Sequence, residues 1–131
     1  MLAVDTNVVI RFLANDNAAQ HKRAVALFRA HDIWLTKTVL LESEWVLRSA
    51  FGFGAGDIAQ AFRGLIHLPN VHCEDRPAMS SAIDALAAGM DFADALHFVC
   101  SGQADEGFAS FDARFVKRAR KHWPDTVIRV P

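Results

Sequence analysis

The chain has 131 residues, of which 52% are hydrophobic, so it suits one compact domain spanning residues 1–131 and leaves little length for a second. Its formal net charge is −1, so the protein as a whole is not basic, and no apolar stretch approaches the roughly 20 residues that cross a bilayer. The amino terminus lacks the basic flank and the length of a secretory signal, so we expect a cytoplasmic protein with no membrane contact. Cys73 and Cys100 stand in apolar surroundings and are predicted to be buried free thiols.

Short β-rich runs alternate with segments of helical periodicity. In chain order, the pattern predicts a strand at 2–4, helices at 6–13 and 18–30, a strand at 33–35, helices at 38–50 and 57–68, a short strand or extended loop at 71–73, helices at 78–88 and 92–103, a strand at 108–110, a helix at 113–121 and a strand at 127–130. This alternation is typical of crossover units. It predicts an α/β fold, a three-layer α/β/α sandwich around a mainly parallel sheet of four to five strands.

Two acidic residues follow predicted strands. Met1–Val4 run directly into Asp5, and residues 108–111 run directly into Asp112. Ligands of open parallel sheets collect outside the carboxyl ends of the strands, so these two carboxylates can meet although they are far apart in sequence. Each could instead cap the helix that starts after it, and for either residue alone the two interpretations are about equal.

Two further acids lie on predicted helices. Asp94 interrupts an apolar helix face and has no Lys or Arg three or four positions away. We favour a functional role for it over a first-turn acid that the helix dipole stabilises. Glu42 shares a face with Val39, Trp45 and Val46, again without a cation, and a carboxylate on such a face needs a partner or a raised pKa.

Other acids near these positions have simpler explanations. Glu44 is followed one turn later by Arg48, which predicts a surface ion pair. Asp91 directly precedes the predicted helix at 92–103, so helix capping and metal contact are equally good interpretations of it.

Clustered carboxylates repel one another until a divalent ion neutralises them, and Mg²⁺ and Mn²⁺ prefer oxygen ligands. We therefore predict a Mg²⁺ or Mn²⁺ site whose ligands are Asp5, Glu42, Asp94 and Asp112. The six histidines are scattered and form no pair at metal-ligand spacing. Only His97, one turn from Asp94, could reach the site, and an ordinary partly buried histidine is the better interpretation.

Basic residues crowd the predicted last helix, just past Asp112, where they could contact phosphates. The alternative, a solvated amphipathic helix, is about as good. The run consists of Arg114, Lys117, Arg118, Arg120 and Lys121. Arg11 and Lys37, beyond the first two strands, are lesser candidates for substrate contact.

Four segments in this order resemble the PIN domain, in particular the VapC-type toxins of bacterial toxin–antitoxin pairs. They are Val4-Asp5-Thr6-Asn7-Val8, then Val39-Leu40-Leu41-Glu42 leading into Trp45-Val46-Leu47, then Asp91-Phe92-Ala93-Asp94-Ala95-Leu96, and finally Ser110-Phe111-Asp112 followed by Phe115. The resemblance covers nearly the whole chain.

The resemblance implies a Mg²⁺- or Mn²⁺-dependent endoribonuclease with a parallel sheet flanked by helices. The family's four acids fall on Asp5, Glu42, Asp94 and Asp112, which are both the catalytic and the metal-binding candidates. Asn7, Asp91 and Ser110 match supporting positions, and the RNA-binding candidates are Arg114, Lys117, Arg118 and Lys121. The resemblance also implies a homodimer and a cognate antitoxin as partners.

Two rival functions fit parts of the pattern. A metal-dependent phosphatase would use Asp5 as a covalent nucleophile, but Asp5-Thr6-Asn7 lacks a second acid two positions on. A non-catalytic RNA- or protein-binding module could keep the fold, although such a module would usually have lost one of the four acids.

Overall fold

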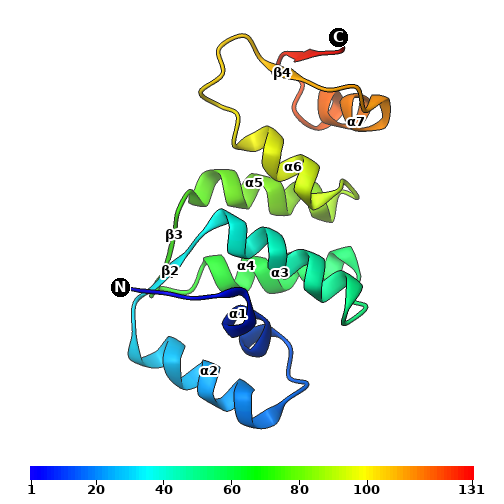
Figure 1. Ribbon diagram of the computed structural model, residues 1–131. Helices are drawn as coiled ribbons and strands as arrows, with labels where there is room; N and C mark the ends of the chain where they lie inside the picture. The colour runs from blue at the N-terminus through cyan, green and yellow to red at the C-terminus, as the bar shows by residue number, and fades with distance from the viewer.

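The computed structural model describes residues 1–131. Three short strands lie along one side of stacked helices, and two more lie with the last helix at one end of the molecule (Figure 1). The four strands predicted from the sequence are present, and residues 71–73, for which a short strand and an extended loop were both possible, form a strand. The elements in chain order are β1 (Leu2–Ala3), α1 (Thr6–Leu13), α2 (Ala18–Ala30), β2 (Ile33–Leu35), α3 (Lys37–Ser49), α4 (Ala55–Ile66), β3 (Val71–Cys73), α5 (Arg76–Ala87), α6 (Phe92–Val99), β4 (Phe108–Ala109), α7 (Ala113–His122) and β5 (Ile128–Arg129).

Side-chain caps set where most of the helices begin. The side chains of Asn17, Thr36 and Asp75 accept hydrogen bonds from backbone N–H groups in the first turns of α2, α3 and α5. Such caps satisfy N–H groups that have no partner inside the helix. Helices α1, α2, α6 and α7 start where the sequence pattern predicts, and α3, α4 and α5 start one or two residues earlier.

The strands form two separate parallel sheets, in the orders β1-β2-β3 and β4-β5. Leu2 lies opposite Ile33 and Ile33 lies opposite Val71 in the first sheet, whereas Phe108 lies opposite Ile128 in the second. The prediction of parallel strands is confirmed, but the prediction of one four- to five-stranded sheet at the centre of a sandwich is wrong. A β-rich run predicts an extended segment. Which other strand it pairs with depends on where the helices on either side of it pack.

The core lies where the helices pack against one another and against the three-stranded sheet. Ile33 and Leu35 of β2 are fully buried, as are Leu40 of α3, Phe62 of α4 and Phe92 of α6. Phe62 and Phe92 meet edge to face, with ring centroids 5.7 Å apart. This packing joins α3, α4, α5 and α6 into one body beside the sheet.

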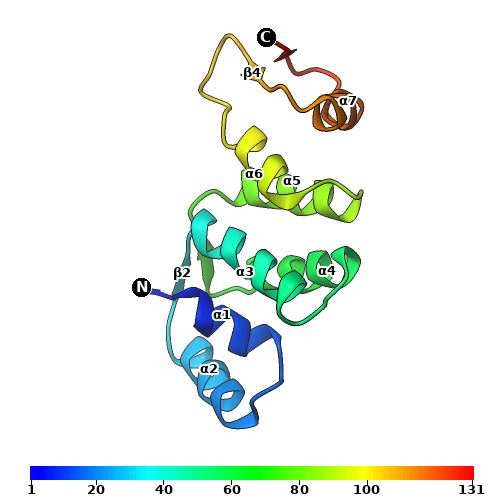
Figure 2. The same cartoon turned by 45° about the vertical axis from the view of Figure 1, so that its right-hand side comes forward.

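Residues Phe108–Arg129, which contain β4, α7 and β5, form a C-terminal module that packs on α5 and α6 (Figures 1 and 2). Phe98 of α6 contacts the rings of Phe108 and Trp123, with centroid separations of 5.3 and 4.7 Å. Trp123 Nε1 also donates a hydrogen bond to Ser81 Oγ of α5 at 3.2 Å. An aromatic cluster therefore holds the module at the end of the molecule away from β1.

Helix α6 ends at Val99, four residues before the predicted end, because Cys100 already occupies its C-terminal cap. Both cysteines are free, as predicted. The prediction that both are buried is wrong, since Cys100 is exposed beyond the helix end and Cys73 is half-buried. Desolvation nevertheless raises the pKa of both thiols.

No helix of the structure combines the length and the apolar character that crossing a membrane requires.

Candidate active site

An acid-rich pocket lies between α3, the turn that links α5 to α6, and the start of α7. Its acidic lining comes from Glu44, Asp91, Asp94 and Asp112. Asp94 is half-buried, whereas Asp91 and Asp112 are exposed. Two of the four acids predicted from the sequence, Asp94 and Asp112, therefore share one pocket although they belong to α6 and to the loop before α7.

Asp91 and Asp94 are fixed relative to each other by the start of α6. Asp91 is the N-terminal cap of this helix, and its Oδ1 accepts a hydrogen bond from the Asp94 N–H at 3.0 Å. Burial raises the pKa of the Asp94 carboxyl, and the negative charges of Asp91 and Asp112 raise it further. A carboxylate that is half-buried beside two other negative charges is suited to bind a cation.

Asp112 is placed by two local hydrogen bonds. Its carboxylate accepts a hydrogen bond from the Phe115 N–H at 3.0 Å and so caps α7. Its own N–H donates to Ser110 Oγ at 3.0 Å. Capping and a role at the pocket are compatible, because a carboxylate has a second oxygen free. Ser110 thus acts on Asp112 through the backbone, as a supporting residue would.

Glu44 belongs to this pocket, a role that the sequence interpretation did not assign to it. Its side chain is only 3% exposed, and its Oε2 accepts a hydrogen bond from Arg48 Nε at 2.8 Å. The predicted ion pair between Glu44 and Arg48 is confirmed, but Glu44 is buried rather than at the surface. The hydrogen bond and charge of Glu44 raise the pKa of Arg48 in turn. The spacing of Glu44 and Arg48 predicted the pair, and only the packing of α3 revealed its burial.

Glu42 does not line this pocket and is exposed, so the premise that it is a buried, unpaired carboxylate is wrong. The buried residues of α3 are Leu40, Ser43, Glu44 and Leu47, which places Trp45 at 60% exposure on the outside. Because Trp45 is apolar, the sequence pattern predicted that its face of the helix is buried, whereas that face is exposed. A role for Glu42 therefore rests on its place in the motif.

Asp5 is also exposed and lies at the start of α1, where its Oδ1 accepts a hydrogen bond from the Thr6 N–H at 2.7 Å. It does not line the pocket that holds Asp94 and Asp112. No three Asp, Glu, His or Cys side chains of the chain lie close enough together to hold a metal ion. Carboxylate oxygens are ligands that suit Mg²⁺ or Mn²⁺. In the single chain, however, the four predicted carboxylates do not all lie together.

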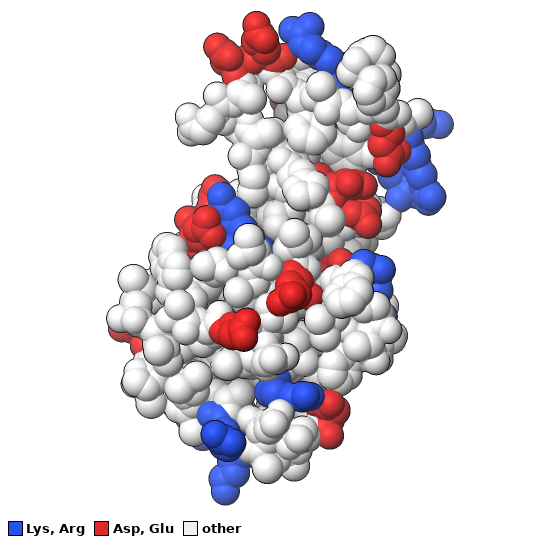
Figure 3. All heavy atoms as spheres, in the orientation of Figure 1, with Lys and Arg blue, Asp and Glu red and all other residues white.

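The basic residues of α7 divide between two environments. Arg114 and Arg118 line the acidic pocket, whereas Lys117 and Lys121 do not and are exposed elsewhere on the helix. Arg118 Nη1 donates a hydrogen bond to the Gly89 carbonyl at 2.5 Å, which ties α7 to the turn before α6. On the face shown in Figure 3, several acidic groups lie across the middle of the molecule, whereas basic groups are scattered over the face, most of them beside acidic groups.

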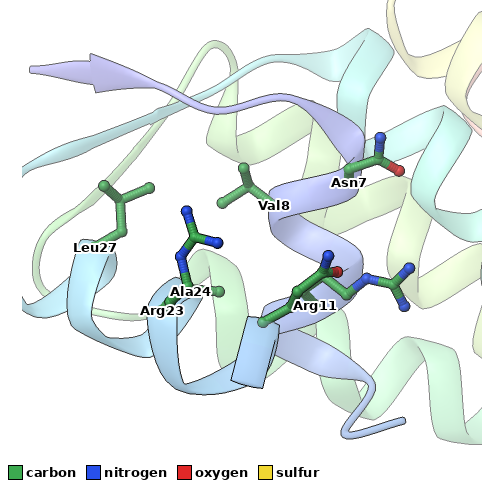
Figure 4. Close-up of a pocket in the computed structure, with 7 residues that line it drawn as sticks. Asn7, Val8, Arg11, Arg23, Ala24 and Leu27 are labelled. Carbon is green, nitrogen blue, oxygen red and sulfur yellow. The ribbon is translucent and has the colours of Figure 1, made fainter. Parts of the chain in front are cut away.

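A second hollow lies between α1 and α2 and is lined by Asn7, Arg11 and Arg23 (Figure 4). Asn7 is exposed here and does not line the acidic pocket. Arg11 pairs with Asp16 at 2.9 Å, and Lys37 lies 3.9 Å from both Glu74 and Asp75, so both lesser basic candidates have acidic partners within the chain.

His97 is exposed on α6, and its charge lowers the pKa of Asp94. The prediction of a partly buried histidine is wrong, because His97 lies on the outer side of the helix while Leu96 and Phe98 beside it are buried.

Parallel strands, connecting helices and carboxylates gathered at helix starts define an α/β protein with an acidic site. Comparison with family models gives the family: residues 2–121 match the PIN domain, so the chain belongs to the PIN-domain family, whose members are generally nucleases. No curated protein and no solved structure matches the chain.

Proposed function

We propose that this PIN domain is a Mg²⁺- or Mn²⁺-dependent endoribonuclease that acts as the toxin of a toxin–antitoxin pair. The observation that carries the nuclease proposal is the pocket in which Asp94 and Asp112 lie with Arg114 and Arg118. Carboxylates can hold a cation and guanidinium groups can bind a phosphate, and the two together suit hydrolysis of a phosphodiester by water.

A divalent ion, when bound, lowers the pKa of a water and neutralises charge that builds on the phosphate. Asp5, Glu42, Asp94 and Asp112 are the proposed ligands and catalytic residues, in agreement with the motif resemblance. The raised pKa of Asp94, which is due first to burial and then to the charges of Asp91 and Asp112, supports this assignment, because a cation would stabilise the ionised carboxylate. Within one chain only Asp94 and Asp112 of this donor set share a pocket.

The remaining residues have roles that follow from their contacts. Asp91 and Ser110 are positioning residues, because they hold the backbone N–H groups of Asp94 and Asp112. Arg114 and Arg118 are the proposed phosphate contacts. Lys117 and Lys121 could bind only parts of the RNA that extend beyond the pocket.

The toxin role is supported by the four motifs in register rather than by the pocket. We infer from them a cognate antitoxin, a homodimeric protein and an RNA substrate in the cytoplasm. Asn7, on the rim of the groove between α1 and α2, lies outside the acidic pocket, so its supporting role would require that groove to be part of the substrate path.

The test is cleavage of a mixed cellular RNA pool with Mg²⁺, with Mn²⁺ and with EDTA, by wild type and by Asp94→Asn and Asp112→Asn variants. Asparagine caps a helix about as well as aspartate, so the Asp112 variant removes charge and keeps the cap of α7. Asp75→Asn, at the cap of α5 outside the pocket, is the matched control.

We expect discrete fragments that require the metal, persist in the Asp75 variant and are lost in the other two. Absence of cleavage by folded wild type on any RNA would reject the nuclease and favour a binding module. Release of phosphate from a phosphomonoester without RNA cleavage would favour the phosphatase instead.

A further inference from the structure

Helices α1 and α2 form a hollow that is separate from the acidic pocket, since no residue lines both (Figure 4). The volume of the hollow is about 370 Å³, within the range of roughly 300–1,000 Å³ that small-molecule sites occupy. Its charged lining consists of Arg11 and Arg23, and no Asp or Glu lines it. In contrast to the acidic pocket, the hollow is therefore suited to an anionic ligand.

The Arg23 guanidinium has no acidic partner within the chain. It is exposed at the hollow and belongs to none of the ion pairs. In Figure 4 its side chain extends from α2 toward Val8 of α1. A guanidinium presents its N–H donors in a planar fork that matches a phosphate, and no carboxylate competes for those of Arg23.

Arg11 differs from Arg23, because Asp16 offsets its charge. Arg11 Nη1 donates hydrogen bonds to both carboxylate oxygens of Asp16 at 2.9 Å. Asp16 does not line the hollow, so this pair holds Arg11 in the wall without placing a negative charge inside. The unbalanced positive charge of the hollow therefore comes from Arg23. A ligand group with a single negative charge, such as a phosphodiester, would balance it.

The rest of the lining combines an apolar surface with two amides. Val8, Ala24 and Leu27 are buried or half-buried. Asn7 and Gln20 are exposed. Apolar side chains suit the face of a nucleobase, and amide side chains carry both donors and acceptors for its edge. Together with Arg23, the hollow thus offers a complementary group to each part of a nucleotide.

We propose that the hollow between α1 and α2 binds one nucleotide of a single-stranded RNA. Arg23 contacts the phosphate, and Val8 and Leu27 contact the face of the base. Asn7 and Gln20 contact its edge. The strand must be single, because a base within a duplex is stacked and cannot present its face. RNA as the ligand rests on the proposed nuclease function, and the hollow adds a contact area for it outside the acidic pocket.

The position of Asn7 connects the hollow with the proposed reaction. Asn7 lies in the first turn of α1, which Asp5 caps, so the hollow begins beside one of the proposed ligand carboxylates. Asn7 would then support the reaction as a substrate contact. An acidic segment of a protein is the other ligand that Arg23 could attract. A single unbalanced cation beside an apolar surface favours a nucleotide over a run of carboxylates.

Binding titrations test the role of Arg23. The ligand is a short single-stranded RNA oligonucleotide, and the protein carries Asp94→Asn and is kept in EDTA so that the RNA stays intact. We expect Arg23→Gln to weaken binding about tenfold, as the loss of one charge-assisted contact would. The control, Lys22→Gln, removes the same charge from an exposed neighbour that does not line the hollow, and should have little effect. Equal losses would overturn the proposal, because they would indicate general attraction to α2.

Methyl NMR tests whether a base lies in the hollow. A nucleobase against Val8 and Leu27 should shift their methyl signals upfield through its ring current, while Ile128 in the C-terminal module is the distant control. Inorganic phosphate and polyglutamate are the comparison ligands, and we expect the shifts with RNA alone. No shift at saturating RNA would overturn the proposal. Equal shifts with phosphate would show an anion site only, and equal shifts with polyglutamate would show a site for an acidic protein segment. Either result would also overturn it.

Kinetics separate this inference from the nuclease function itself. In otherwise wild-type protein with Mg²⁺, Arg23→Gln should raise KM for RNA about tenfold and leave kcat nearly unchanged, because the contact is equally strong in the ground state and the transition state. Cleavage that Arg23→Gln does not affect, without methyl shifts, would reject the nucleotide site and leave the nuclease. Methyl shifts without cleavage by the wild type would reject the nuclease and leave the nucleotide site.

Discussion

Asp91 Oδ1 accepts a hydrogen bond from the Asp94 N–H at 3.0 Å, while the negative charge of Asp91 raises the pKa of the Asp94 carboxyl. Asp91 therefore stabilises the start of α6 through its hydrogen bond and disfavours the ionised form of Asp94 through its charge. These two effects can be separated by substitution, since one depends on a hydrogen-bond acceptor and the other on a charge.

For Asp91, we predict that Asp91→Ala lowers the free energy of unfolding by about 1 kcal/mol, because the cap of α6 is lost. Asp91→Asn keeps an acceptor at the cap and should stay close to wild type. Chemical denaturation of both variants in EDTA measures the difference. Equal losses in the two variants would show that the cap contributes little.

For Asp94, we predict that Asp94→Asn raises the metal-free free energy of unfolding at neutral pH by up to about 1 kcal/mol. Its folded pKa lies above the unfolded one, so ionisation disfavours the folded state. The penalty is complete above the folded pKa and disappears as the pH falls below the unfolded pKa of about 4. Thermal unfolding in EDTA should therefore show a gain at neutral pH that vanishes in acid. A gain independent of pH would contradict this cause.

For the buried pair, we predict that Arg48→Met lowers the free energy of unfolding by about 1 to 3 kcal/mol, because it leaves the Glu44 carboxylate buried without a partner. Adding Glu44→Gln should restore part of the loss. The control is Arg63→Met, whose partner Asp84 is exposed, with an expected loss below about 1 kcal/mol. A double-mutant cycle measures the coupling, and similar losses at the two sites would contradict the importance of burial.

For the C-terminal module, we predict that Gly107→Ala lowers the free energy of unfolding by more than about 1 kcal/mol. Gly107 has a φ of +99°, and a Cβ there would lie 2.9 Å from the Cβ of Val127 and closer still to its carbonyl oxygen. That carbonyl accepts the Phe108 N–H, so the β4-β5 pairing would loosen. Hydrogen exchange of the Phe108 N–H measures how far the β4-β5 pairing loosens. Gly102→Ala, which meets no neighbour, is the control.

For RNA contact, we predict that Arg114→Gln weakens RNA binding and reduces the salt dependence by about 0.7 in the log–log slope, the value for one single-strand phosphate contact. Arg114 lines the acidic pocket, whereas Lys117 on the same helix does not. Lys117→Gln should therefore change both quantities less. Binding titrations at several salt concentrations, on a cleavage-deficient Asp94→Asn background, measure this. Equal effects would indicate nonspecific attraction to α7.

The sequence by itself determined the features that depend on neighbours along the chain. Local patterns predicted four of the strands, the starts of α1, α2, α6 and α7, and the pair of Glu44 with Arg48. They did so through alternation, capping residues or a spacing of one helical turn. The four motifs also indicated the PIN-domain family, which the family model confirms. These signals depend on residues that are close in sequence, so they can be recognised without knowing how the chain packs.

Tertiary structure alone decided which strands share a sheet and which acids share a pocket. Docking of the C-terminal module on Phe98 separates β4 from β1, and with it Asp112 from Asp5. The rotation of α3 on the core buries Glu44 and exposes Glu42, although the two residues are two positions apart. Both outcomes depend on contacts between segments distant in sequence, whose relative placement no local pattern specifies.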